Sequence, residues 1–471
     1  MSFRRRLLEA ERLVSFSDVY LVPRRAHVEP HQVSLATRFS RSIALSIPVA
    51  SSPMDTVSGP RMAIAMALKG GIGVLHRNCS VDEQVEMARR VKEAVPIPIE
   101  DLYVYPYEPC GRVLEVMRRR GVREIPVINE DGKCIGRVLL SEVIKLCKES
   151  AAQPIESIVV PSKPQTLDSI EDARRLIIEG KRDAIAIVDS DGRYLGTLTI
   201  AGALEEVQPL VDEKGELMVA AAVSPFDIER AKKLDKIVDA LVSDVAHFHN
   251  DNVIHAARRL VKEIAHDFVA GNIGTYEAAR DVVSEIERVD GLRVGIGGGS
   301  ICTTPEVGGV YAPTLWAVAS VRDALEEMNV DVPIIADGGI RTPGDAVKAL
   351  AAGASCVMLG FVLAGTDEAE APLVVAGQRM YKPYRGMASR GAMERRFAAD
   401  RYTRVVKRAP EGVEGLVPYK GPVFRVLDEF VEGIKAGLGY AGARSIEELW
   451  RVAVFGYTPR KSIPPELRTS L

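Results

Sequence analysis

The chain has 471 residues, which is enough for two or three domains. Hydrophobic residues make up 47% of it and charged residues 27%, as in an ordinary soluble globular protein, and the formal net charge is −3. The lack of a basic excess argues against a dedicated nucleic-acid site, and no apolar run approaches the length of a membrane span.

The N-terminal stretch MSFRRRLLEAERL is basic but has no long apolar region, so we interpret it as a surface helix or arm and not as a signal peptide. The six cysteines are scattered, with no CxxC pair and no Cys/His metal spacing: Cys79, Cys110, Cys134, Cys147, Cys302 and Cys356. This pattern predicts free thiols and a cytoplasmic location.

Eight short apolar runs predict parallel strands that are buried on both faces. They cover residues 47–51, 71–76, 217–223, 240–244, 268–272, 292–297, 333–339 and 355–360. Helical patterns lie between most of them, such as VDEQVEMARRVKEA, TYEAARDVVSEIERV and TPGDAVKALAAG. Eight strands that alternate with helices predict an α/β fold, a (β/α)8 TIM barrel.

Residues 96–213 interrupt this alternation and contain an internal repeat. IPVINEDGKCIGRVLL at 125–140 aligns with IAIVDSDGRYLGTLTI at 185–200, and each copy has two apolar strands around an Asp-Gly turn. We predict two small modules, about 96–150 and 151–213, inserted between the second and third strands of the barrel. The barrel itself would then comprise residues 1–95 and 214–471, with the catalytic loops in the second part.

The active sites of TIM barrels are built from the loops at the C-terminal ends of the strands. Polar residues follow several predicted strands here: Ser52, Met54 and Asp55 after the first, Asp244 and His247 after the fourth, and Asn272 after the fifth. We expect these residues to meet at one face of the barrel.

The seventh and eighth predicted strands end in ADGGIRTPGD and MLGF. Loops at these two places commonly bind phosphate through glycine N–H groups and a helix N-terminus. Gly338, Gly339 and Gly360 suit that role, and Asp337 is positioned to accept a sugar hydroxyl. A tight turn without any ligand is the alternative interpretation of the paired glycines.

The segment GGGSICTTPEVGG places Cys302 after three glycines and Ser300, with Thr303 and Thr304 behind it. A glycine-rich loop allows close approach of a ligand or an ion, so we interpret Cys302 as a nucleophile. Cys356, inside an apolar strand, is more typical of a small buried hydrophobic residue. Residues 381–420 are charged and poorly periodic, which indicates either a mobile lid or a solvated surface loop.

Several blocks of this sequence, in order, resemble the inosine 5'-monophosphate (IMP) dehydrogenase family. They include SSPMDTVSGPRMAIAMALKGGIGVLHRN, VAGNIGTYEAARDVV, VGIGGGSICTT, VPIIADGGIRTPGDAVKALAAGAS, YRGMASRGAM, DRYT and PEGVEGLVPYKGP. The inserted repeat is similar to the tandem CBS modules that this family carries at the same place.

The resemblance implies a two-step reaction that uses NAD as the cofactor. A thiolate, matched by Cys302, attacks C2 of the purine of IMP, hydride passes to NAD+, and water hydrolyses the covalent xanthylate to xanthosine 5'-monophosphate (XMP). Thr304 matches the residue that positions this water, and Arg401 and Tyr402 match the flap pair that activates it. This is the first committed step of guanine nucleotide synthesis.

The resemblance also implies the binding residues. Those around IMP are Ser52, Met54, Ser300, Asp337, Gly338, Gly339, Gly360, Tyr384, Gly386, Met387 and Glu411. Asp244 is implied at the nicotinamide ribose and Asn272 near the reactive centre, and Gly295 and Gly297 are also implied in cofactor binding. Carbonyl oxygens of Gly295, Gly297 and Cys302 would hold a potassium ion.

Some positions depart from the family pattern. Phe361 replaces a serine that binds phosphate, and Pro305 stands where arginine or glutamine is common. The tail YTPRKSIPPELRTSL does not match the segment that completes the potassium site from a neighbouring subunit. Both CBS copies lack the usual Ser/Thr-x-x-Asp ending, so an adenine or guanine nucleotide ligand and a purely structural module both remain open there.

Two other functions remain open. A guanosine 5'-monophosphate (GMP) reductase, which uses NADPH, resembles the chain around Cys302 but typically lacks the pair formed here by Arg401 and Tyr402. A purine-nucleotide sensor without catalysis would need none of the reactive residues. The resemblance implies a homotetramer or an octamer.

Overall fold

The computed structural model describes residues 10–204, 208–377, 379–394 and 411–458. The chain divides into two compact units. One comprises Met1–Ala94 with Gln208–Leu471, and the other comprises Val95–Val207.

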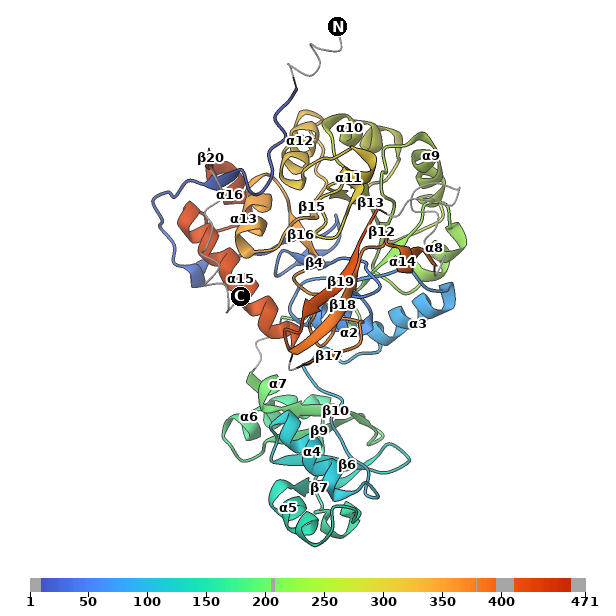
Figure 1. Ribbon diagram of the computed structural model, residues 1–471, viewed down its shortest axis with the longest axis vertical. Coiled ribbons are helices and arrows are strands. Elements are labelled where there is room, and N and C mark those ends of the chain that lie inside the picture. The colour runs from blue at the N-terminus through green and yellow to red at the C-terminus, as the bar shows by residue number, and fades with distance from the viewer. Residues whose placement is uncertain (1–9, 205–207, 378, 395–410, 459–471) are drawn as a thin grey trace. The chain divides into compact units, whose positions relative to one another are not determined.

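The larger unit contains the eight predicted strands in one parallel sheet (Figure 1). They are β4 (Val49–Ser51), β5 (Val74–Leu75), β11 (Ala220–Val223), β12 (Ala240–Ser243), β13 (Asp267–Ile273), β14 (Gly291–Val294), β15 (Ile334–Asp337) and β16 (Cys356–Leu359). Their order is β4-β16-β15-β14-β13-β12-β11-β5, and a parallel bridge between Ala50 and Ile72 joins the two ends. The predicted (β/α)8 barrel is therefore confirmed.

Side chains from alternate strand positions fill the inside of the barrel. Many of them are small, including Ala220, Ala222 and Ala240, and Cys356 lies among them without solvent exposure. This complete burial confirms that Cys356 serves as a core residue, and it also raises the pKa of the thiol.

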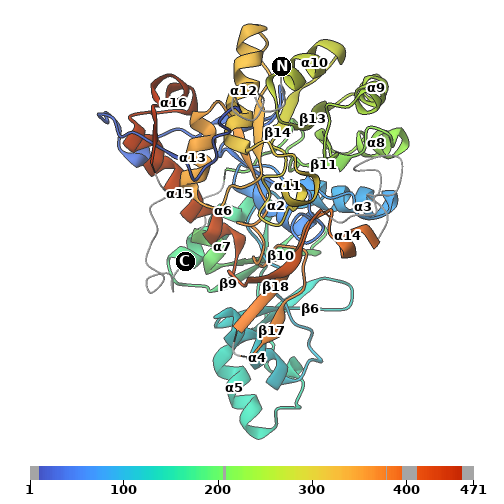
Figure 2. The ribbon, with the colours of Figure 1, turned by 45° about the horizontal axis from the view of Figure 1, so that its top comes forward.

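Helices surround the strands, and α8, α9, α10 and α12 follow one another around the outside (Figure 2). The helices of this unit are α2 (Pro60–Leu68), α3 (Val81–Lys92), α8 (Ile228–Leu234), α9 (Asp251–Leu260), α10 (Tyr276–Glu285), α11 (Thr304–Gly308), α12 (Thr314–Glu327), α13 (Pro343–Ala351), α14 (Arg390–Glu394), α15 (Val423–Ala441) and α16 (Ile446–Val452). Capping boxes begin two of the predicted helices, with Ser80 and Glu83 at α3 and Thr342 and Asp345 at α13.

A separate antiparallel sheet covers part of the segment that was predicted as a lid or loop. It consists of β17 (Val374–Ala376), β18 (Arg379–Arg385) and β19 (Glu414–Pro418). Both ends of the segment are thus regular structure, while residues 395–410 lie outside the described ranges. The same unit also has two short antiparallel pairs of strands. They are β1 (Val19–Leu21) with β20 (Phe455–Tyr457), and β2 (Thr37–Arg38) with β3 (Ala44–Leu45).

The smaller unit contains the internal repeat as two similar halves. The first has α4 (Cys110–Arg120), β6 (Glu124–Ile128), β7 (Cys134–Leu139) and α5 (Leu140–Glu149); the second has β8 (Gln165–Thr166), α6 (Ile170–Ile178), β9 (Ala184–Val188), β10 (Tyr194–Thr199) and α7 (Ile200–Leu204). Arg123 and Asp183, which are 60 positions apart, form a bidentate ion pair between the halves. Equivalent positions therefore meet where the two halves pack together.

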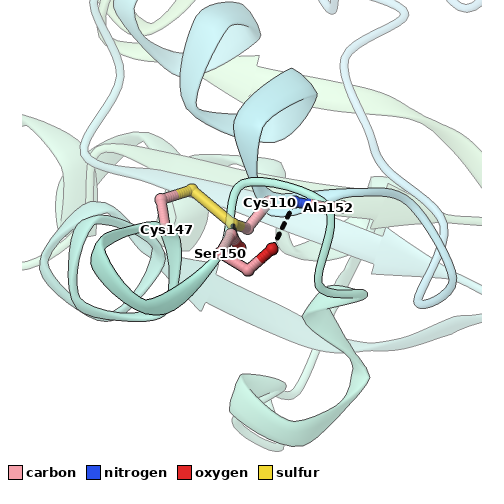
Figure 3. The surroundings of a disulfide bond; sticks show 4 residues. All are labelled: Cys110, Cys147, Ser150 and Ala152. Carbon is pink, nitrogen blue, oxygen red and sulfur yellow. Dashed lines mark hydrogen bonds between the residues drawn. A yellow bond between two sulfur atoms is a disulfide. The ribbon is translucent and has the colours of Figure 1, made fainter.

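One prediction about the cysteines is wrong. Cys110 on α4 and Cys147 on α5 form a disulfide inside the first half of the smaller unit (Figure 3). The other four cysteines are free. Sequence spacing could not reveal the pair, because only the packing of α4 against α5 brings the two side chains together. No helix in the described ranges is both long and apolar enough to cross a bilayer.

Candidate active site

An open cavity of about 970 Å³ lies at the C-terminal ends of the barrel strands. This volume includes space that is open to solvent. Most residues predicted from the sequence line it: Ser52, Met54, Asn272, Gly295, Gly297, Ser300, Cys302, Thr304, Asp337, Gly338, Gly339, Gly360, Tyr384, Gly386, Met387 and Glu411. The structure therefore brings together residues that are up to 359 positions apart in the sequence, from Ser52 to Glu411.

Two glycine-rich loops pack backbone against backbone beside Cys302. A Cβ atom on Gly338 would lie 3.0 Å from the carbonyl carbon of Gly298, and the φ of Gly338 is 102°. A side chain at this position would be strained and would also separate the loops. The glycines after β14 and β15 are therefore needed for the loops to meet.

The thiol of Cys302 belongs to a short hydrogen-bonded chain. Its Sγ lies 3.1 Å from Oγ1 of Thr304, and that hydroxyl donates to Oε2 of Glu411 at 2.9 Å. Because the single hydroxyl proton of Thr304 points to Glu411, the thiol is the donor to Thr304. The arrangement gives the thiol proton a path toward a carboxylate, as the activation of a cysteine nucleophile requires.

Backbone pairing holds Glu411 beside this loop. The N–H of Thr303 donates to the carbonyl of Glu411 at 3.0 Å, and the N–H of Val413 donates to the carbonyl of Ile301, also at 3.0 Å. The N–H of Glu411 donates to the carbonyl of Ala388. The segment that precedes β19 is thus joined to the Cys302 loop on one side and to the residues after β18 on the other.

A buried polar network lies at the ends of β12 to β15. Asp337 accepts hydrogen bonds from Nδ2 of Asn272 at 2.9 Å and from Nε of Arg293 at 2.8 Å. Arg293 also reaches Asp244 at 3.3 Å, and Arg77 lies 3.4 Å from the same carboxylate. The network fixes the rotamer of Asp337, whose backbone carbonyl accepts from Thr314.

Asp244 itself does not line the cavity, because its carboxylate is fully buried. A contact with a nicotinamide ribose would require its ion pairs to open. Ala246 and Asn272, by contrast, line the cavity beside the glycine loop and leave room for a cofactor next to Cys302. The side chain of Ala246 is small and that of Asn272 is uncharged, and both properties suit a neighbouring nicotinamide ring.

The predicted potassium ligands are backbone carbonyls, and one of them already accepts a hydrogen bond. The carbonyl oxygen of Gly295 accepts a hydrogen bond from Nδ2 of Asn272 at 2.9 Å. Because a carbonyl oxygen has two lone pairs, this hydrogen bond leaves Gly295 able to bind a cation, and the potassium site stays a prediction. No cluster of three or more acidic, His or Cys side chains suited to a metal occurs in the described ranges.

The loops after β15 and β16 form the predicted phosphate end of the cavity. Gly338, Gly339 and Gly360 line it, and their N–H groups donate no hydrogen bond to any described residue. Ser300 lies opposite and accepts a hydrogen bond from Nε of Arg341 at 3.2 Å. The hydroxyl of Tyr384 and the sulfur of Met54 both lie close to Gly360. Burial raises the pKa of Tyr384, so its hydroxyl stays protonated and can donate.

A buried ion pair anchors the end of β18. Arg385 contacts both carboxylate oxygens of Asp55, at 3.0 and 2.5 Å, and Asn78 donates to the same carboxylate at 2.7 Å. Burial alone would raise the pKa of Asp55, but the hydrogen bonds from Arg385 and Asn78 outweigh it and hold the pKa below its usual value. The pair positions Gly386 and Met387, which follow directly and line the cavity.

Arg401 and Tyr402, the predicted flap pair, lie outside the described residues. Sequence reasoning missed Arg293, which lines the cavity and holds Asp337. An arginine inside the otherwise apolar run LRVGIG was the signal that could have identified it. It also missed Arg341 and Lys420, which lie in loops without a distinctive pattern. Pro305 occupies the first turn of α11, where proline is well tolerated.

The model of the IMP dehydrogenase / GMP reductase domain matches residues 13–463. The chain is 46% identical over 463 residues to an inosine-5'-monophosphate dehydrogenase of Korarchaeum cryptofilum, and the match covers 96% of each chain. It is 42% identical over 464 residues to that of Thermoplasma acidophilum, covering 96% of this chain and 94% of the relative.

Two solved structures of a cysteine-to-alanine variant of GMP reductase from Trypanosoma brucei are also similar. The one in complex with guanosine 5'-monophosphate is 36% identical with a TM-score of 0.67, and the match covers 96% of both chains. The other is 34% identical with a TM-score of 0.74, and the match covers 96% of this chain and 98% of the other.

Proposed function

The chain belongs to the IMP dehydrogenase / GMP reductase family, and from that premise we propose that it is an NAD-dependent oxidoreductase that converts IMP to XMP. The observation that carries the proposal is the hydrogen-bonded chain of Cys302, Thr304 and Glu411 inside the cavity. The relatives named inosine-5'-monophosphate dehydrogenase, at 41–46% identity, support the direction of the reaction.

In the first step, the thiol proton leaves Cys302 through Thr304 toward Glu411, and the sulfur attacks C2 of the purine. Bound NAD+ supplies an acceptor for the hydride that leaves C2, so IMP loses two electrons. The product remains attached to Cys302 through a C–S bond. The fixed distance of 3.1 Å between the sulfur and the hydroxyl supports this assignment, because nucleophile and proton acceptor are already within hydrogen-bond reach.

In the second step, water adds to C2, the C–S bond breaks, and XMP leaves with the thiol restored. Thr304 and Glu411 are the described groups that can orient this water and take its proton. Arg401 and Tyr402 remain the proposed flap residues that activate it. A potassium ion at the carbonyls of Gly295, Gly297 and Cys302 remains a prediction.

The substrate would lie with its phosphate at Gly338, Gly339 and Gly360 and its ribose at Asp337. The free N–H groups of the glycines and the fixed carboxylate support this orientation, since N–H groups bind phosphate and a carboxylate binds ribose hydroxyls. Ser52, Met54, Ser300, Tyr384, Gly386 and Met387 would complete the pocket.

Four further proposals concern the rest of the protein. Val95–Val207 would be a tandem CBS module, for which the repeated halves give support. A nucleotide ligand at that module, a homotetrameric or octameric assembly, and a cytoplasmic location remain predictions.

GMP reductase is the alternative, because the two solved structures named above are GMP reductases. One pair of assays distinguishes the two enzymes. Purified protein with IMP and NAD+ should form NADH, and the activity should be lost in Cys302→Ala. Consumption of NADPH with GMP, without NADH formation from IMP, would show that the reductase assignment is right. If neither assay shows activity although the protein is folded, the interpretation as a nucleotide sensor is favoured.

A further inference from the structure

Lys420 follows β19 and forms hydrogen bonds with the turn that follows barrel strand β16. Its Nζ donates to the carbonyls of Phe361 at 2.8 Å and Val362 at 2.9 Å, and its own N–H donates to the carbonyl of Gly365. The same ammonium lies 4.9 Å from the ring centroid of Phe361, within the range of a cation–π contact. Lys420 thus contacts both the backbone and the side chain of a residue that lines the cavity.

These contacts fix the direction of three consecutive peptide units. The carbonyl of Gly360 accepts from the N–H of Ala364, and the next two carbonyls accept from Lys420. In a trans peptide the N–H points opposite to the carbonyl. The N–H groups of Phe361, Val362 and Leu363 therefore point back toward the start of the turn, where Gly360 lines the cavity.

None of these three N–H groups donates a hydrogen bond within the described residues. Val362 and Leu363 are buried, and buried N–H groups in native proteins are nearly always paired. A ligand with several acceptor oxygens at the start of the turn would satisfy them.

The charge of Lys420 also lacks a counterion. No carboxylate forms an ion pair with its ammonium in the described part of the chain, and burial lowers its pKa to about 8. The titratable groups on the neighbouring segments are Asp367, Glu368, Lys382, Tyr384 and Tyr419. Asp367 accepts from the hydroxyl of Tyr419, Glu368 accepts from the N–H of Val423, and Lys382 donates to the carbonyls of Asp367 and Ala369. None of these hydrogen bonds involves Lys420.

We propose that Lys420 is a positioning residue for the phosphate of the nucleotide, which it serves by aiming the N–H groups of the 361–363 turn and by supplying a positive charge that the phosphate balances. This inference rests on the proposed function, because it takes a nucleoside monophosphate as the ligand. It also explains how the site accommodates Phe361, which offers no hydroxyl to the phosphate.

The test compares IMP with inosine, which lacks the phosphate, in equilibrium binding to the full-length protein. Lys420→Met keeps much of the side-chain stem and removes the charge, so IMP affinity should fall roughly tenfold or more while inosine affinity changes less than twofold. Lys420→Arg should restore part of the loss. Lys262→Met, an exposed lysine paired with Glu287, should leave both affinities unchanged.

The pH dependence gives a second readout. The folded pKa near 8 means that Lys420 is charged at pH 7 and neutral at pH 9. IMP affinity of the wild type should therefore fall by up to about tenfold between these values, and Lys420→Met should lack this decrease. Inosine binding in the same buffers corrects for all other titrating groups.

Equal losses for IMP and inosine in Lys420→Met, or no loss at all, would overturn the assignment of Lys420. If instead the wild type binds inosine and IMP equally, or neither, the proposed function fails. NADH formation from IMP by the wild type separates the two failures, since it supports the function whatever Lys420 does.

Discussion

At the residue scale, the central feature is the hydrogen-bonded path from the thiol of Cys302 through Thr304 to the carboxylate of Glu411. The hydroxyl of Thr304 donates to Glu411, so its oxygen is left to accept from the thiol of Cys302. Glu411 lies more than one hundred residues after Cys302 in the chain, and backbone hydrogen bonds hold it beside the Cys302 loop. The chemistry therefore depends on the position of a carboxylate as much as on the thiol.

Replacement of Glu411 by glutamine tests this dependence. We expect kcat to fall by roughly 10²-fold or more, because a neutral amide cannot take the proton. KM for IMP should change much less. Steady-state NADH formation measures both parameters. Glu306→Gln, an exposed glutamate on α11, is the matched control and should behave as the wild type. A rise in KM with unchanged kcat would mean that Glu411 only binds the purine.

Asp55 gives a prediction about stability and pH. Its folded pKa lies below the unfolded value, so its contribution to stability is present above about pH 4 and is lost as the pH falls through the folded pKa. Asp55→Asn leaves Arg385 without its partner and should lower the free energy of unfolding at pH 7 by about 3–5 kcal/mol.

Urea unfolding of both proteins at pH 7 and pH 3 measures this effect. The difference between wild type and Asp55→Asn should shrink at pH 3, because the Asp55 carboxyl of the unfolded chain is mostly protonated there. Asp323→Asn, an exposed position on α12, should show no such pattern. An equal difference at both pH values would contradict the ion-pair account.

At the element scale, the disulfide joins α4 to α5 within one half of the smaller unit. It closes a loop of 37 residues, for which a stabilisation of about 2–4 kcal/mol is typical. We expect reductant to shift the unfolding transition of this unit to lower denaturant concentration in the wild type.

The double variant Cys110→Ala/Cys147→Ala should show the reduced stability without reductant and should no longer respond to it. Thiol titration of the unfolded wild type without reductant should find four free cysteines, in line with the four unpaired ones. Six reactive thiols in that experiment would mean that the bond does not form.

The elements also show where sequence reasoning succeeds. Apolar runs without alternation identified all eight barrel strands, because parallel strands covered on both faces need apolar residues on both. The limits of the strands were less accurate, since 71–76 was predicted and only Val74–Leu75 forms a strand. A residue such as Ile72 makes a single bridge to Ala50 instead of a ladder, which no local pattern encodes.

At the scale of the whole molecule, strand order explains why distant motifs converge. Loops after β4, β14, β15 and β16 are neighbours because β4 pairs with β16 and closes that side of the barrel. Fold type, the site face and most of the cavity lining could be predicted from the sequence. The ion pairs of Asp244 with Arg77 and Arg293 could not be predicted, because both arginines reach its carboxylate only through tertiary packing.

The most direct test of the central claim is detection of a purine bound covalently to Cys302. The wild type is mixed with IMP and NAD+, quenched in acid during turnover, digested and examined by mass spectrometry. We predict a xanthosine monophosphate adduct on the peptide that contains Cys302, and its absence from Cys302→Ala. Formation of NADH without any adduct on that peptide, at quench times shorter than one turnover, would contradict the role assigned to the thiol.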